Sequence, residues 1–451
     1  MAIIPPSLEE LVGHFSAVFS RPTGRRFAVF ILAVIVTLGR RTVCNVVRTA
    51  PALLSGHVCS YHRLFSRRRW SSWALARRLA ELVIGRLVPK GARIHLTADD
   101  TVDEHRGRKV YGKDRHRDAQ RSSRNFRAFL WGHKWVVLAV VVRLPFAKRP
   151  WALPVLVALF RSPKWHAIHG GRHRTPPELL AGLLAVLLRW FPERRFTVSG
   201  DGNFATHQLA MLAARSRNRL TVVSRFYSDA FLFEPPPPAS AHRGRGRKPL
   251  KGAKADSPAE VVAKSPRQCI TTRWYGATRR RVEIVSAVGH WYRAGKGLVA
   301  VRWVFVHCPG SERKDEYFFT TDLRLSPKSI IEIYTERWSI EVTYEDARAY
   351  LGLGTTRCRS ERAVLREAPL LFGLYSFVVL AYTQMVPAGR AEGPKICWPG
   401  KTSLAFSDVV TVLRRRLWLE WIIPNCAGPR AFAIIKPDLR ELLLAALAPA
   451  G

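Results

Sequence analysis

The sequence RFTVSGDGNF, residues 195–204, decides the fold, because it is typical of a short buried strand that ends in the turn Gly200-Asp201-Gly202. Residues 205–215 follow with the periodicity of a helix, and residues 220–224 form another apolar run of strand length. A strand, a helix and a second strand in this order are typical of a sheet that is covered by helices.

The residues before this stretch extend the pattern. Residues 93–98 (RIHLTA), 135–144 and 151–160 are rich in apolar and β-branched residues and predict three strands, and residues 175–188 predict a helix that starts at Thr175. Three strands, a helix, a strand, a helix and a strand predict a mixed α/β sheet.

Three acids stand out by their position in this pattern. Asp99 follows the strand at 93–98, Asp201 lies between two glycines at the end of another, and Glu341 lies inside a helix predicted over residues 329–351. In open α/β sheets, ligand sites gather at the carboxyl ends of strands. The three carboxylates are therefore candidates for a divalent metal site, with Asp100 as the competitor for the first position. Taken singly, each acid is better explained as a solvated turn or cap residue, and only their order and context favour the metal site.

The helix around Glu341 carries several polar groups on one face. Tyr334, Arg337, Glu341, Tyr344 (or Glu345) and Arg348 recur at steps of three and four residues. Carboxylate, guanidinium and phenol groups together suit a metal ion and a phosphate better than a core. The alternative is an amphipathic helix with ion pairs between successive turns.

This spacing resembles a family signature. Tyr334, two residues, Arg337, three residues, Glu341, six residues and Arg348 resemble the Tyr-Arg-Glu-Lys pattern of a large group of DDE transposases from bacterial insertion sequences. Arg348 replaces the final Lys, which keeps the charge but changes the geometry.

The two aspartate segments resemble the other motifs of the same family. Asp99-Asp100-Thr101 is similar to the first motif, in which a Thr follows the Asp by two residues, and this favours Asp99. Residues 200–204 (GDGNF) are similar to the second motif. The gap of 140 residues between Asp201 and Glu341 is similar to that of relatives with a β-rich insertion there. The resemblance covers roughly residues 30–390.

The resemblance implies a fold, a reaction and partners. It implies an α/β fold with an RNase H-like mixed-sheet catalytic core, interrupted by a β-rich insertion and flanked by helical N- and C-terminal regions. It also implies two Mg²⁺ or Mn²⁺ ions bound by Asp99, Asp201 and Glu341, and a homodimer that binds transposon ends and target DNA. Phosphate contacts would come from Tyr334, Arg337 and Arg348.

In some relatives the cleaved strands pass through a hairpin, and an aromatic residue of the insertion stacks on a flipped base. Trp274, Trp291 and Trp303 lie in the corresponding region. The alternative is that these tryptophans are half-buried in a sheet.

A low-complexity segment from His242 to Ala255 (HRGRGRKPLKGAKA) is basic and without acids. We expect a flexible loop that follows DNA phosphates through Arg243, Arg245, Arg247 and Lys248, with a plain solubilising linker as the alternative.

The expected organisation has five parts. A basic helical region (residues 1–90) either carries a helix-turn-helix or packs as a plain helical unit. The first part of the core (91–228) is followed by the basic loop and insertion (229–325), the Glu-bearing helix (326–360) and a C-terminal helical region (361–451).

Composition agrees with a nucleic-acid partner. The 451 residues include 73 Lys and Arg and 33 Asp and Glu, so the formal charge is 73 − 33 = +40, while 47% of the residues are hydrophobic. A folded, strongly cationic protein attracts polyanions, and nucleic acid is the favoured one.

Other compartments and partners are disfavoured. The apolar run at residues 27–38 is too short to cross a membrane and predicts a buried helix. There is no signal-peptide pattern, and the seven cysteines form no CxxC pair, so we expect a cytoplasmic protein with no membrane partner.

The resemblance therefore implies a cut-and-paste DNA transposase that cleaves DNA at the element's ends and joins them to a target. Two alternatives stay open: a catalytically retired or domesticated transposase that only binds DNA, and a structure-specific DNA nuclease.

Overall fold

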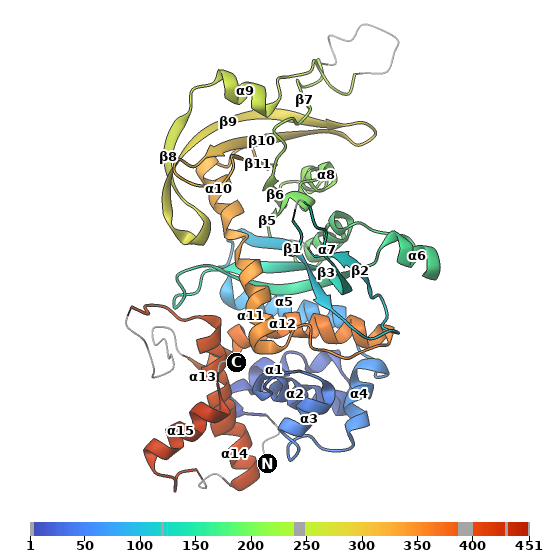
Figure 1. The fold of residues 1–451 in the computed structure, drawn as a ribbon, viewed down its shortest axis with the longest axis vertical. Helices are drawn as coiled ribbons and strands as arrows, with labels where there is room; N and C mark the ends of the chain where they lie inside the picture. Colours follow the sequence, from blue (N-terminus) through green and yellow to red (C-terminus); the bar gives the residue numbers. More distant parts are fainter. Residues whose placement is uncertain are drawn as a thin grey trace.

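A mixed sheet of eleven strands forms the centre of the computed structural model, which describes residues 4–118, 121–123, 125–238, 249–386, 400–428 and 432–449 (Figure 1). The strand order is β2-β3-β1-β5-β6-β11-β10-β9-β7, with β4 paired to β3 and β8 paired to β9. The strands are β1 (Ile94–Glu104), β2 (Asp114–Arg117), β3 (Phe129–Val142), β4 (Trp151–Phe160), β5 (Phe196–Gly200), β6 (Leu220–Arg225), β7 (Leu232–Phe233), β8 (Gln268–Arg273), β9 (Arg279–Arg293), β10 (Gly297–His307) and β11 (Glu316–Thr320).

Helices precede, cover and follow this sheet. The N-terminal and middle helices are α1 (Glu9–Gly13), α2 (Arg21–Val36), α3 (Val43–Thr49), α4 (Val58–Ser66), α5 (Ser72–Leu87), α6 (Pro163–His169), α7 (Pro176–Trp190), α8 (His207–Arg215) and α9 (Pro258–Lys264). The later helices are α10 (Pro327–Glu336), α11 (Ser339–Leu351), α12 (Glu361–Met385), α13 (Phe406–Leu417), α14 (Ile423–Ala427) and α15 (Pro437–Leu447). A π-helical turn η6 (Trp418–Ile422) joins α13 to α14, and short 3₁₀ turns are η1 (Pro6–Leu8), η2 (Ser16–Val18), η3 (Gly202–Phe204) and η5 (Tyr275–Ala277).

Five strands in the order β4-β3-β1-β5-β6 carry the predicted mixed pattern. β1, β5 and β6 are parallel, whereas β3 runs antiparallel to β1 and β4 antiparallel to β3. The predicted mixed α/β sheet is confirmed. The helix predicted over residues 175–188 is α7, and it starts as predicted, because Thr175 and Glu178 form a reciprocal cap at its N-terminus.

β1 is longer than the sequence pattern indicated. The predicted strand stops at residue 98, but β1 continues to Glu104, where it pairs with Gly132 of β3. Polar residues dominate this extension, so no apolar alternation marks it. Its strand conformation depends on the partner β3, which also begins earlier than predicted, at Phe129.

The chain between β6 and α10 extends the same sheet. β11 pairs antiparallel with β6 through Phe319 and Ser224, and β10 and β9 follow outward. In Figure 1 these strands lie above the core strands, with α9 over their far side. Arg243, Arg245, Arg247 and Lys248 lie outside the described residues.

The N-terminal helices share one hydrophobic core with the sheet. Residues 27–36 of α2 are buried, so the predicted buried helix is confirmed, and α5 packs on α12 beneath the sheet (Figure 1). Among the described residues, α12 is the one helix long and apolar enough to cross a membrane, and 72% of its apolar window is buried inside the protein. Burial of this kind is what a core helix shows.

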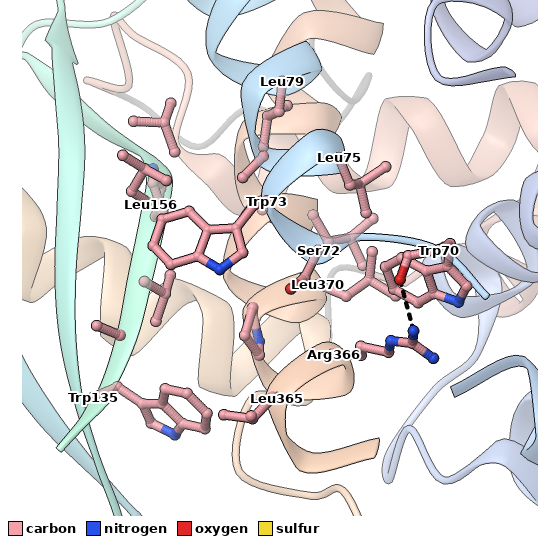
Figure 2. A pocket seen from close by; sticks show the side chains of 18 of the residues that line it. Trp70, Ser72, Trp73, Leu75, Leu79, Trp135, Leu156, Leu365, Arg366 and Leu370 are labelled. Atoms are coloured by element: carbon pink, nitrogen blue, oxygen red, sulfur yellow. Dashed lines mark hydrogen bonds between the residues drawn. The ribbon is translucent and has the colours of Figure 1, made fainter. Parts of the chain in front are cut away.

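A cavity of about 340 Å³ lies where α5, β4 and α12 meet (Figure 2). Its walls include Trp73, Leu156 and Leu370. At its rim, Arg366 of α12 donates a hydrogen bond of 2.6 Å to the carbonyl oxygen of Trp70. The guanidinium therefore ties the N-terminal helices to the central helix.

Candidate active site

Asp99 and Asp201 meet where two parallel strands separate. The last residues paired between β1 and β5 are Ala98 and Gly200, and each aspartate is the next residue. The sequence pattern predicts Asp99 just after the end of a strand. In the structure Asp99 lies inside β1. What ends there is the pairing with β5, and this opens a gap into which both carboxylates can project.

The turn after β5 explains the glycine before Asp201. A Cβ at Gly200 would lie 2.8 Å from the Cβ of Phe204, so a larger residue does not fit. The carboxylate of Asp201 caps η3 by accepting hydrogen bonds of 3.0 Å from the Asn203 backbone N–H and 3.2 Å from the Asn203 amide. Asp201 is therefore held at the strand end by its own turn.

The predicted long helix is divided at the site. α10 ends at Glu336 and α11 begins at Ser339, with 3₁₀-type hydrogen bonds from Trp338 N–H to Thr335 and from Glu341 N–H to Trp338 at the junction. Glu341 consequently lies in the first turn of α11, where the helix dipole favours a carboxylate.

Arg337 links two of the three acids. Its Nη1 donates to Oδ2 of Asp99 at 2.9 Å, and its Nη2 donates to Oε1 of Glu341 at 3.0 Å. Burial lowers the pKa of this guanidinium, but Asp99, Tyr334, Glu341 and Asp201 together raise it above its ordinary value. Asp99 and Glu341 therefore share one buried cation, and Asp201 is near enough to act on it electrostatically.

Burial and neighbouring charges shift the pKa of Asp99. Burial raises the pKa of Asp99 to about 7, the Arg337 guanidinium opposes this, and the Asp201 carboxylate adds to it. Asp100, the competitor, pairs instead with Lys134 at 2.9 Å. Asp99 is the residue that contacts the Glu-bearing helix, which favours it over Asp100 for the first position.

The next turns of α11 attach the helix to β1. The Tyr344 hydroxyl donates a hydrogen bond of 3.2 Å to the carbonyl oxygen of Asp99. Arg348 donates a hydrogen bond to the Thr101 hydroxyl, and its guanidinium lies 3.9 Å from Oδ1 of Asp103. Sequence reasoning missed Asp103. Alternation along the strand from Asp99 through Thr101 is the signal that places it on the same face.

Tyr334 is buried beside Arg337, whose guanidinium lies 5.7 Å from the centre of the Tyr334 ring. It lies on α10, is 1% exposed, and packs on Phe318 with a ring separation of 4.3 Å. In this arrangement the ring contacts Arg337 rather than solvent, and the phosphate contact by Tyr334 stays a prediction.

The predicted stacking tryptophans are placed differently from one another. Trp274 and Trp303 are buried, at 6% and 1% exposure, so neither offers a ring face to a base here. Trp291 is half-buried and packs against His207, Phe226 and Phe319. Trp291 fits the half-buried alternative, whereas Trp274 and Trp303 are more deeply buried than that alternative expected.

A missed aromatic residue lies beside the site. Trp338, at the α10–α11 junction, is 39% exposed and contacts the Tyr275 ring edge-on at 5.6 Å. Both rings lie within reach of the Arg313 guanidinium, which is 4.0 Å from the Tyr275 ring centre. They line a cavity of about 430 Å³ together with Arg143, Arg149, Arg273 and Arg280. Trp338 directly follows Arg337 of the family signature, and this position is the sequence signal that could have identified it.

The donor set suits a hard divalent cation. Asp99, Asp201 and Glu341 offer carboxylate oxygens, and the raised pKa of Asp99 means that added positive charge would favour its ionised form. Among the residues that the structure describes, no three metal-ligating side chains are close enough to hold an ion as they stand. The Arg337 guanidinium supplies the positive charge between Asp99 and Glu341.

A comparison with family models decides the classification. Residues 14–283 match the model for the DDE superfamily endonuclease. The chain belongs to this family. Asp99 and Asp201 of this DDE-family chain lie inside the matched range, and Glu341 lies beyond it.

Two further comparisons concern individual proteins. No curated protein matches the chain. Among solved structures, the DDE-family chain is similar to a piggyBac transposase in a cryo-EM synaptic complex with hairpin DNA. The sequence identity is 11% and the TM-score 0.41, over 99% of this chain and 82% of the other.

Proposed function

We propose that this protein is a DDE transposase of a bacterial insertion sequence, which cleaves DNA at the element's ends and transfers the strands into target DNA. One observation carries the proposal. Asp99 and Glu341, which are 242 residues apart, share the Arg337 guanidinium at the point where Asp201 leaves the neighbouring strand. A structural ion pair needs only one carboxylate beside the guanidinium. Glu341 and Asp201 are further carboxylates near Asp99, and oxygen ligands of this kind suit metal ions that act on a phosphodiester.

The three carboxylates would bind two Mg²⁺ or Mn²⁺ ions. Bound ions of this kind activate an attacking oxygen and stabilise the leaving oxygen of a phosphodiester. Arg337 keeps Asp99 and Glu341 in place by two hydrogen bonds from one rigid group, and Tyr344 fixes the backbone at Asp99. These contacts orient the ligands before DNA arrives.

The remaining parts of the chain would hold DNA. The cavity beside Trp338 combines five arginines with Tyr275 and Trp338, which suits a DNA strand close to the three acids. Residues 229–325 would be the β-rich insertion, Arg348 would contribute positive charge near the phosphates, and the basic loop with Arg243 to Lys248 would follow the backbone. Two copies would pair the element's ends.

Cleavage of the natural DNA ends tests the proposal. Purified protein, Mg²⁺ and a duplex that carries the inverted repeats flanking the reading frame should give nicks at the repeat termini. Glu341→Gln should reduce nicking to the background without protein. The exposed Glu345, one turn further along α11, provides the matched control, and Glu345→Gln should nick normally.

Two outcomes would contradict the proposal. Nicking by Glu341→Gln at the wild-type rate would remove the assigned active site. Specific binding to the repeats with no metal-dependent nicking by the wild-type protein would favour a retired transposase, and cleavage of branched DNA without repeats would favour a structure-specific nuclease.

A further inference from the structure

The β2–β3 hairpin exposes large aromatic rings away from the active site. Phe129 and Trp131, two residues apart on β3, are 47% and 55% exposed, and Phe126 in the preceding turn is 64% exposed. Alternation along a strand places Phe129 and Trp131 on one face. Clustered exposed rings on a folded protein indicate a binding surface rather than a core.

Strand register sets cations against these rings. Arg115 and Arg117 of β2 pair with Trp131 and Phe129. The Arg115 guanidinium lies 4.2 Å from the centre of the Phe129 ring, and the Lys113 ammonium lies 5.4 Å from the Trp131 ring. We call Phe129, Trp131, Lys113, Arg115 and Arg117 the hairpin surface.

The surroundings of the hairpin surface are also cationic. A groove of about 640 Å³ beside Phe129 and Trp131 is lined by Arg106, Arg108 and Arg121. Residues 104–131 contain nine Lys or Arg and three Asp or Glu, an excess of 9 − 3 = +6. Such a surface attracts a polyanion and repels a second copy of this chain, which carries the same charge.

The hairpin surface and the candidate active site share a sheet face. Asp99 is opposite Val137 in the β1–β3 register, and residues 137, 135, 133 and 131 alternate onto one side of β3. Six residues of strand separate Val137 from Trp131, about 20 Å. The strand face between them is covered, because His133 and Trp135 are 1% exposed and Phe372 of α12 packs on Trp135, so the hairpin surface is a separate surface at the end of this sheet face.

We propose that the hairpin surface binds unpaired, single-stranded DNA. Aromatic rings stack on bases whose faces are free, and basic side chains beside them contact the phosphates. A duplex covers its base faces and would use only the cations. The proposal rests on the proposed function, because the bound segment would be a strand freed at the cleaved end.

Fluorescence anisotropy of the full chain tests this proposal in EDTA, where no metal-dependent cleavage occurs. The probes are an oligothymidylate of about 20 nucleotides and a duplex of equal length. Phe129→Ala combined with Trp131→Ala should weaken binding to the single strand by roughly 5- to 150-fold for each base that loses its stack and leave duplex binding within about 2-fold, while Trp131→Phe should retain most single-strand affinity. Trp73→Ala, an exposed ring on α5, is the control.

Two results would overturn the proposal. Unchanged single-strand affinity of the double variant, with a wild-type melting profile, would show that the rings do not stack on bases. Equal losses for both probes would make the surface a duplex site. Neither result depends on nicking, so a failure here is distinct from a failure of the cleavage test.

Discussion

At the scale of single residues, Arg337 determines how the acids are arranged. The side chains of Arg337 and Asp99 are only 10% and 15% exposed, so each charge depends on the other for compensation. The i,i+4 bond to Glu341 alone would be an ordinary helix pair. The hydrogen bond to Asp99 joins the α10–α11 junction to β1, so that Asp99 and Glu341 share one cation.

Arg337→Ala should therefore destabilise the protein. Removing the guanidinium leaves Asp99 buried beside Asp201, and the expected loss in free energy of unfolding is about 3 kcal/mol. Thermal and urea unfolding measure it. Arg324→Ala removes an exposed cation that pairs with Asp322 and should change stability little. Equal melting of Arg337→Ala and the wild type would contradict the structural role of the bridge.

A second residue-scale prediction concerns pH. Burial raises the pKa of Glu367, on α12, to about 7, and its contact with Cys358 opposes this. The native state therefore keeps a proton that the unfolded state loses above pH 4.5, so this stabilisation is complete below pH 4.5 and disappears as the pH rises through 7.

Unfolding at pH 5 and pH 8 measures this effect. The wild type should lose about 3 kcal/mol relative to Glu367→Gln between these pH values, because the amide does not titrate. Parallel pH profiles for the two proteins would show that Glu367 titrates normally.

At the scale of elements, the sequence predicted what depends on local pattern. β4 coincides with its predicted limits, and α7 begins at its cap, because apolar runs and caps are local signals. The extension of β1 and the break before α11 were missed because both depend on tertiary partners. The acids were predicted from strand ends and family motifs. A functional role for Trp338 became apparent only from the cavity that it lines.

Close contact between β1 and β3 requires Gly132. A Cβ there would lie 1.9 Å from the carbonyl oxygen of Asp103, so Gly132→Ala must push the strands apart. We expect a loss of about 2 kcal/mol in free energy of unfolding. Gly85→Ala, where a Cβ meets nothing within 4 Å inside α5, should stabilise by about 0.5 kcal/mol. Thermal unfolding compares them, and the reverse order would contradict the register.

At the scale of the whole molecule, charge is divided between a cationic surface and a small acidic site. The net charge of +40 surrounds the three carboxylates. DNA affinity should therefore fall steeply with salt, because each phosphate contact releases counterions. Salt should therefore weaken DNA binding more than cleavage, because cleavage depends on the three acids.

Arg280, in the cavity beside Trp338, offers a direct check. If it contacts one phosphate, Arg280→Ala should reduce the slope of log affinity against log salt by about 0.9 for duplex DNA. Binding titrations at several salt concentrations measure the slope. An unchanged slope would place the DNA backbone elsewhere.

If Asp99, Asp201 and Glu341 form one metal site, Mn²⁺ should bind the protein through all three carboxylates. Titration of Mn²⁺ into the protein, followed by electron paramagnetic resonance of free Mn²⁺, tests this without DNA or catalysis. Asp99→Asn, Asp201→Asn and Glu341→Gln should each weaken Mn²⁺ binding by at least about 10-fold, and Glu345→Gln should leave it unchanged. Wild-type affinity in any of the three variants would contradict the claim.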